Sequence, residues 1–290
     1  MRKSLLLLFI SSSIYATAQQ DGIYSSEGFN TFEHNPASYG NGEFWSVNTF
    51  GRLQWVGVDG APKSIHVNGG VQLPLGILMN WKRNLTIIAG SSYMYKEVGF
   101  QKIHTWNFAI GMPIRIGKET ELKFAIAPGI YATNLGSTWI FSQSSSDSLQ
   151  SRANFDLSAG MLYRWKSLYV GFSVTHLLAQ EINNSGFRLA RHYHLQAGYK
   201  VPVGQHYLYP MLQAKFDGAG MVLQSMNYFV FKNNLFSLGA GYRVQDAILL
   251  GAAFEFKGFR LGYNYDITLN PLAAYSSGSH ELRLSYIRRI

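Results

Sequence analysis

The chain has 290 residues, contains no cysteine and carries a formal net charge of +9. Charged residues make up only 14% of it and aromatic residues 15%, which leaves little charge to cover a water-facing exterior. The sequence also lacks an apolar run of roughly 18 residues, so it predicts no membrane-spanning helix, and the missing cysteines exclude disulfides and thiolate metal sites. In lipid only helices and closed barrels satisfy every backbone hydrogen bond, and an aromatic-rich chain without such helices therefore indicates a β-barrel.

The first 18 residues predict a secretory signal peptide. Arg2 and Lys3 form a basic start, residues 5–10 form a short apolar stretch, and the Ala-Thr-Ala run at 16–18 fits a cleavage site. We therefore expect the mature chain to begin at Gln19 with a net charge of +7, since two of the basic residues leave with the signal. The remaining basic excess is not attributed to nucleic acid, because the sequence contains no nucleic-acid-binding motif.

Residues 19–42 show no strong hydrophobic period and contain several Gly and Ser residues. Asn35-Pro36-Ala37 within them is typical of an Asx-Pro turn. We expect this segment to lie in the periplasm or inside the lumen of the barrel, and the barrel itself to occupy residues 43–290.

From residue 43 onward, large apolar and small polar residues alternate. Ile65 and Val67, for example, alternate with His66 and Asn68. Successive side chains of a strand point to opposite faces, so the pattern predicts strands with one apolar and one polar face. A soluble β-sandwich would turn the apolar face inward, whereas a membrane barrel turns it toward lipid and lines its lumen with the polar face.

The alternation predicts an all-β, transmembrane antiparallel barrel of about fourteen strands in a bacterial outer membrane. The longest links, at 134–152, 178–190 and 267–280, are the fifth, seventh and thirteenth, so they all lie at one end of such a barrel. This sorting of long and short links fits an outer-membrane barrel, which has long external loops and short periplasmic turns. The predicted strands start near Phe44, Ser64, Leu85, His104, Glu121, Ala153, Ser167, Arg191, His206, Met221, Leu235, Ala247, Phe259 and Glu281.

The run from residue 52 to 63 is the most distinctive in the chain. Asp59-Gly60 and Pro62 predict a turn, and Trp55 before it is typical of the aromatic belt at a membrane interface. The run therefore predicts either a purely structural hairpin or an element that contacts a partner. Its candidate partner-binding residues are Arg52, Gln54, Trp55, Asp59, Pro62 and Lys63.

Other polar residues do not form a recognisable reaction centre in the sequence. His192 and His194 share one face of a strand and would be half of a metal site, but no further ligand is placed by spacing. Hydrolase, metalloprotease and phosphate-binding motifs are missing, so we predict no catalytic, cofactor-binding or metal-binding residues and no enzyme activity. Charged residues expected to face the lumen as pairs are Asp156, Glu255 and Asp266 with Arg164, Arg243 and Arg260.

Several runs together resemble the PorP/SprF family of type IX secretion and gliding-motility barrels. The runs are Ala18-Gln19-Gln20-Asp21, Asn35-Pro36-Ala37-Ser38-Tyr39-Gly40, Arg52, Gln54-Trp55-Val56-Gly57, Asp59-Gly60-Ala61-Pro62-Lys63 and Tyr275-Ser276-Ser277-Gly278-Ser279-His280-Glu281. They extend from the signal junction to the last strand, so the resemblance covers the whole mature chain.

The resemblance implies an accessory role in the outer membrane rather than a transport channel. It implies that the barrel docks, exports or anchors an adhesin-like surface protein, by contact with that protein or its C-terminal domain. Outer-membrane lipid and periplasmic lipoproteins or peptidoglycan-binding components are the other partners it implies. The alternative is a passive or substrate-specific pore, which a lumen rich in Gly, Asn, Ser and Lys would also suit.

Overall fold

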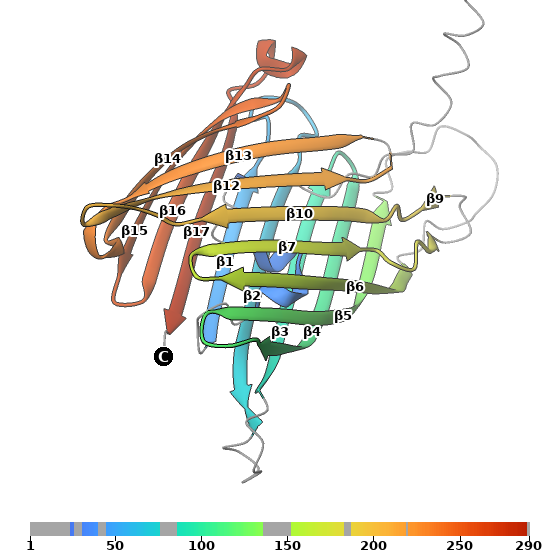
Figure 1. Ribbon diagram of the computed structural model, residues 1–290. Coiled ribbons are helices and arrows are strands. Elements are labelled where there is room, and N and C mark those ends of the chain that lie inside the picture. Colours follow the sequence, from blue (N-terminus) through green and yellow to red (C-terminus); the bar gives the residue numbers. More distant parts are fainter. Residues whose placement is uncertain are drawn as a thin grey trace, which may run out of the picture.

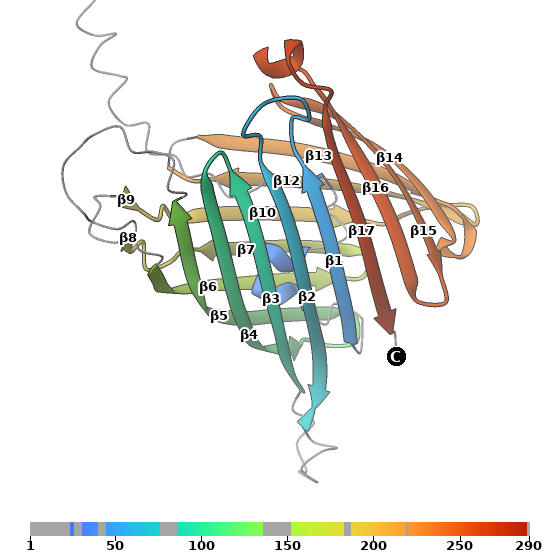
Figure 2. The same cartoon turned by 180° about the vertical axis from the view of Figure 1, so that it is seen from behind.

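The computed structural model describes residues 24–25, 31–39, 45–75, 86–135, 152–182, 187–218 and 220–288. The predicted signal peptide lies outside these residues. The described chain forms a closed barrel of antiparallel strands, and a short N-terminal segment lies inside it (Figures 1 and 2). Within this part of the chain, no helix has the length and hydropathy needed to cross a bilayer.

Fourteen strands build the barrel wall, as the sequence predicted. They are β1 (Trp45–Leu53), β2 (Lys63–Pro74), β3 (Thr86–Val98), β4 (Gln101–Arg115), β5 (Thr120–Leu135), β6 (Arg152–Trp165), β7 (Leu168–Thr175), β10 (His192–Tyr199), β12 (His206–Phe216), β13 (Met221–Val230), β14 (Phe236–Arg243), β15 (Ala247–Phe256), β16 (Phe259–Thr268) and β17 (Ser279–Arg288). Each begins within three residues of its predicted start.

The smaller elements lie inside the barrel or at its ends. Strands β8 (Glu181–Ile182) and β9 (Phe187–Arg188) form a separate hairpin, and β11 (Val201–Val203) pairs with β12. The short 3-10 helices are η2 (Thr31–Glu33), η3 (Pro36–Ser38), η4 (Lys232–Asn234) and η5 (Pro271–Ala274).

The first and last strands close the barrel. β1 pairs with β17 over its whole length, from Trp45 opposite Arg288 to Leu53 opposite His280. Every other wall strand pairs with its two neighbours in sequence, including β10 with β12 across the β11 hairpin. The closed ladder leaves no free sheet edge, which is the condition for a sheet to lie in lipid.

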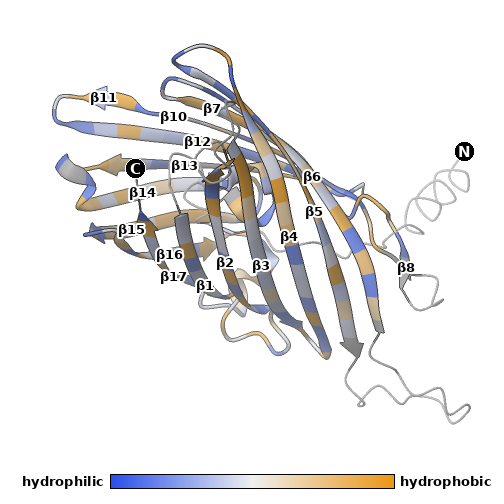
Figure 3. Cartoon of the chain, turned by 90° about the horizontal axis from the view of Figure 1, so that it is seen from below, coloured by the Kyte–Doolittle hydropathy of each residue, from blue (hydrophilic) through white to orange (hydrophobic). Residues whose placement is uncertain are grey.

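Burial follows the alternation that the sequence predicts. On β2, Ile65 is 55% exposed and Val67 44%, whereas His66 and Asn68 are 5% and 2% exposed. The wall therefore turns its apolar side chains outward and its polar side chains into the lumen, which is the inverse of a soluble domain. Figure 3 shows the resulting alternation of hydrophobic and hydrophilic positions along the strands.

The two ends of the barrel carry different connections. We call the end with the links 54–62, 176–191 and 269–278 the loop end, and the end where β1 begins and β17 stops the turn end. Tight turns at 166–167 and 257–258 lie at the turn end, as predicted from the even numbers of these links along the chain. The link 75–85, most of which lies outside the described residues, is a longer exception at the same end.

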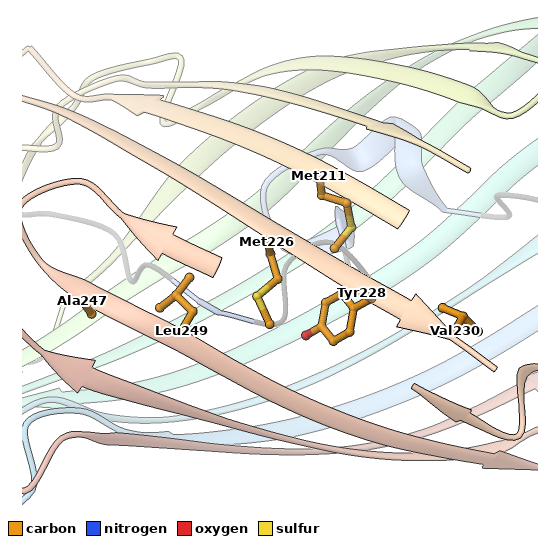
Figure 4. Packing of buried hydrophobic residues seen from close by; sticks show 6 residues of the cluster. All are labelled: Met211, Met226, Tyr228, Val230, Ala247 and Leu249. Atoms are coloured by element: carbon orange, nitrogen blue, oxygen red, sulfur yellow. The ribbon is translucent and has the colours of Figure 1, made fainter. Parts of the chain in front are cut away.

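The lumen is packed with side chains. We call residues 24–25 and 31–39, which lie inside the barrel, the inner segment. Its residues Tyr24, Ala37 and Tyr39 are each 2% exposed or less. Against the opposite wall, an apolar cluster is formed by residues of β12, β13 and β15, and Figure 4 shows its side chains packed together. Its members are Met211, Met226, Tyr228, Val230, Ala247 and Leu249.

Candidate functional site

The hairpin between β1 and β2 forms an ordered rim at the loop end. Its base is closed by the Gln54 amide, which donates to the Pro62 carbonyl at 2.9 Å. Within it, the Val58 amide donates to the carbonyl of Trp55, and Gly60 accepts a bond from the Gly99 amide of the neighbouring link at 2.8 Å. Trp55 itself has a φ of +48°, a left-handed conformation that costs a non-glycine residue about 1–2 kcal/mol.

The rim is joined to the loop before the last strand. The Val56 amide donates to Gly278 at 2.8 Å, and the Ser277 amide donates back to Val56 at 2.7 Å. The Trp55 amide also donates to the Ser279 hydroxyl at 3.1 Å. Two runs that are far apart in the sequence therefore form one platform, which we define as residues 54–62 with residues 275–279.

The loop that carries η5 is itself preorganised. Asn270 caps η5 by accepting from the Leu272 amide at 2.9 Å, and its side-chain amide donates to Asp246 at 2.7 Å. Tyr275, at the end of η5, is 75% exposed, which leaves a large aromatic side chain presented above the barrel wall. The loop thus holds an exposed aromatic on a backbone that is fixed from several directions.

Five of the six predicted partner-binding residues lie on or beside this platform. Asp59 and Lys63 are exposed, and Gln54, Trp55 and Pro62 are half-buried. Arg52 does not share this surface, because it is 3% exposed and points into the lumen. The reason is the alternation of β1, which turns Asn48, Phe50 and Arg52 inward together.

Arg52 belongs to a buried ionic network just below the platform. It contacts Asp266 at 2.7 Å and Glu281 at 3.2 Å, and Arg243 contacts Asp266 at 3.1 Å and Asp246 at 2.9 Å. These groups come from β1, β14, β16, β17 and the link between β14 and β15. The network therefore ties the closing seam between β1 and β17 to the neighbouring wall.

Ser25 of the inner segment occupies the centre of this network. Its amide donates to Glu281 at 3.0 Å, and its hydroxyl donates to Asp266 at 2.5 Å and accepts from Arg52 and Arg243 at 3.2 and 3.0 Å. These bonds give buried charges the partners that a low-dielectric interior requires. The start of the described segment is thereby fixed at the loop end of the lumen.

The run from Asn35 to Tyr39 is the second anchor of the inner segment. Asn35 accepts from the Ala37 amide at 3.0 Å, which forms the predicted Asx-Pro turn, and its side-chain amide donates to the Met161 carbonyl at 3.0 Å. A Cβ atom at Gly160 would collide with Asn35. The segment thus packs directly on the backbone of β6.

Tyr39 fits against the other wall in the same way. Gly70 of β2 and Gly90 of β3 face each other in register, and a Cβ atom at either one would collide with the Tyr39 ring. Burial raises the pKa of the Tyr39 phenol above its ordinary value, against a smaller lowering by its hydrogen bond with Ser92. The phenol therefore stays neutral, and its ring packs against the backbone of the two glycines.

Histidines and carboxylates fill the lumen around the inner segment, between Ser25 and the run from Asn35 to Tyr39. Glu33 contacts His66 at 2.6 Å, Asp156 contacts His176 at 2.7 Å, Asp217 lies 3.9 Å from His192, and His34 stacks on His194 with ring centroids 4.4 Å apart. Across the described ranges, no three His, Cys, Asp or Glu side chains gather as a metal site would require. Six charged residues were expected to face the lumen without assigned pairs. Among them Arg243 contacts Asp266 and Arg260 contacts Glu255, whereas Arg164 contacts Glu121 and Asp156 contacts His176.

The barrel is similar to outer-membrane proteins of known structure. The toluene transporter TbuX of Ralstonia pickettii aligns with a TM-score of 0.56 and 9% identity, over 90% of this chain and 93% of that chain. Omp33 of Acinetobacter baumannii aligns with a TM-score of 0.47 and 8% identity, over 86% of this chain and 98% of that chain. At 9% identity, the likeness to TbuX shows the fold alone.

Sequence comparison identifies the family. No curated protein matches the chain. The profile of the type IX secretion system membrane protein PorP/SprF matches residues 16–286, which include every strand of the barrel wall except the last residues of β17. The resemblance noted from the sequence runs is thereby confirmed, and with it the membrane location. The chain belongs to the PorP/SprF family of type IX secretion system membrane proteins.

Proposed function

We propose that this barrel is an accessory protein of type IX secretion that docks an exported, adhesin-like surface protein at its loop end. Its action is binding without a catalytic step. The observation that carries the proposal is the platform of residues 54–62 and 275–279, in which two of the runs that carry the family resemblance are hydrogen-bonded into one exposed rim. A protein that served only as a membrane barrel would not need hydrogen bonds between these two exposed runs.

The even number of strands orients the barrel in this proposal. β1 begins and β17 stops at the turn end, which faces the periplasm in this proposal, and the loop end faces outward. The exported protein or its C-terminal domain then contacts the platform and η5, and periplasmic lipoproteins or peptidoglycan-binding components contact the turn end. A platform fixed by backbone hydrogen bonds loses little conformational entropy on binding, which favours affinity.

The filled lumen supports docking over the alternative of a pore. Tyr24, Ser25 and the run from Asn35 to Tyr39 are buried between the two walls and hydrogen-bonded to them. Conduction would require the inner segment to leave contacts with charged groups that are themselves buried. In planar bilayers, the intact protein is therefore expected to conduct little compared with an open barrel of the same strand number.

The test removes the central side chains of the platform. We expect Trp55→Ala combined with Asp59→Ala to lower surface display of the exported partner about tenfold or more, since buried aromatic anchors dominate interface energetics. Display is measured per folded barrel, and a pulldown from native outer membranes in mild detergent with mass spectrometry identifies the partner. Trp106→Ala on the outer face of β4 is the matched control.

A second variant separates docking from folding. Trp55→Gly removes the indole but suits the positive φ at this position, so the backbone of the rim is kept. Loss of display with normal barrel level in both variants supports docking. Unchanged display and unchanged partner recovery in both would rule the platform out as the docking element.

A further inference from the structure

A polar cavity of about 460 Å³ lies at the turn end, between the link from β4 to β5 and the link from β6 to β7. Basic side chains dominate its lining. Its lining residues are Arg115, Gly117, Lys118, Glu119, Thr120, Glu121, Arg164, Lys166 and Ser167. Its volume is enough for several residues of an extended peptide or for a comparable ligand.

The cavity contains fewer carboxylates than basic side chains. Glu121 is nearly buried and has Arg164 at 2.9 Å, Lys123 at 3.6 Å and Arg115 at 3.8 Å. Glu119 has Lys166 at 3.3 Å. Among the described residues that line the cavity, four basic side chains (Arg115, Lys118, Arg164 and Lys166) face two carboxylates, an excess of two positive charges.

The excess charge is accessible. The Arg115 side chain is 72% exposed, and those of Lys166 and Glu119 are 56% and 59% exposed. Glu121 and Lys123 form a buried floor beneath them. An incoming anion therefore meets exposed cations at the entrance and buried charges below, without first breaking the buried contacts.

The cavity opens toward the mouth of the lumen rather than toward lipid. Arg115 shares the inner face of the wall with buried Glu121, its partner in register, whereas Ile114, Ile116 and Trp165 are exposed on the outer face. Lys200 near the same mouth lies over the Tyr207 ring at 5.5 Å and adds positive charge there. A ligand consequently approaches along the barrel axis, from the solution that bathes the turn end.

We propose that this basic vestibule binds an acidic peptide segment of a partner protein. The cations are spread along two adjacent turns rather than gathered around one point, a spacing that suits successive carboxylates better than a single phosphate. Arginine and lysine pair with carboxylates through charge-assisted hydrogen bonds, and their excess accelerates encounter with an acidic chain. The vestibule takes its periplasmic orientation from the proposed function, but it is separate from the loop-end platform.

The experiment measures binding of a fluorescein-labelled hexaglutamate peptide to the full-length folded protein by fluorescence anisotropy. We expect binding that weakens strongly between roughly 50 mM and 300 mM salt, because exposed charges are screened. Lys118→Gln and Lys166→Gln should each weaken binding about two- to fivefold, and their combination with Arg115→Gln about tenfold or more. Lys102→Gln and Arg191→Gln, exposed basic residues at the loop end outside the platform, are matched controls and should change nothing.

Two results would overturn the proposal. The first is equal hexaglutamate affinity of the triple variant and the unsubstituted protein, or equal loss in the loop-end controls. The second is occupation by lipid, in which nanodiscs of phosphatidylglycerol abolish peptide binding while nanodiscs of phosphatidylcholine preserve it. Surface display is a separate readout: its loss in platform variants with normal hexaglutamate binding would keep the two sites distinct.

Discussion

The two ends of the lumen handle charge in different ways. At the loop end, Arg52 and Arg243 lie against Asp266 and Glu281, all are nearly inaccessible, and Ser25 is bonded into the group. At the turn end, the cavity carries more cations than carboxylates and its outer cations are exposed. Arginine–carboxylate contacts are thus sealed from solvent in the loop-end network and open to solvent in the turn-end cavity.

The difference indicates different roles. A sealed network contributes to structure because each of its charges depends on the others, and removal of one leaves the rest buried without compensation. An open and unbalanced cluster contributes little to stability but attracts ions of opposite charge. We therefore expect loop-end charges to govern barrel stability and turn-end charges to govern binding.

The largest expected effect comes from Arg52→Met. This change leaves Asp266 and Glu281 buried beside one cation fewer, which should destabilise the folded barrel by about 3–5 kcal/mol. Urea unfolding in detergent, followed by tryptophan fluorescence, measures it. The control is Arg115→Met at the turn end, for which we expect a loss of about 1 kcal/mol or less. Similar losses in both variants would remove the distinction between sealed and open charges.

The next effect concerns the fit of the inner segment. Gly70→Ala places a methyl group against the Tyr39 ring, and overpacking of this kind costs about 1–3 kcal/mol. We expect the segment to be displaced, which raises conductance in planar bilayers. Gly262→Ala, where a Cβ atom meets only ordinary contacts, is the matched control. Tyr39→Ala should restore stability to the Gly70→Ala chain, and failure of this rescue would show that the strain lies elsewhere.

Alkaline pH should weaken the same contact. Because the pKa of Tyr39 is raised in the packed state, the stabilisation is present below the ordinary pKa of about 10 and is lost as the pH rises beyond it. Each unit above that value costs about 1.4 kcal/mol until the packed phenol ionises. Tyr39→Phe should flatten this decline between about pH 10 and 11, as urea midpoints would show. An identical decline in both chains would assign the alkaline sensitivity to other tyrosines.

Much of the wall could be predicted from the sequence because a strand has a strict period of two. Each wall strand was found within three residues of its start, and Arg243 and Arg260 were expected in the lumen with Glu255 and Asp266, although the individual pairs were not assigned. The same alternation places Arg52 inward with Asn48 and Phe50, so the signal for its burial was present in the sequence. Because Arg52 also belongs to the distinctive run at 52–63, it was assigned to the partner-binding surface instead.

Contacts that depend on the closure of the barrel could not be predicted. Asn35 meets Met161, and Val56 meets Gly278, across separations that no local pattern encodes. The inward glycines on β2, β3 and β6 were visible as small residues, but only the folded wall shows that they accommodate Asn35 and Tyr39. The basic vestibule likewise arises because two turns, distant in sequence, are adjacent around the barrel.

The smallest expected effect on stability comes from Lys166→Gln. Lys166 and Glu119 are both more than half exposed, so water already screens their ion pair and its loss should cost about 0.5 kcal/mol or less. Its buried counterpart is Arg243→Gln, which removes a cation from Asp266 and Asp246 and should cost several-fold more. Urea midpoints of the two variants, measured beside hexaglutamate affinity, place each residue on one side of the comparison. A large loss of stability with Lys166→Gln would make the turn-end cluster a structural element, since a binding surface exposed to solvent has no reason to support the fold.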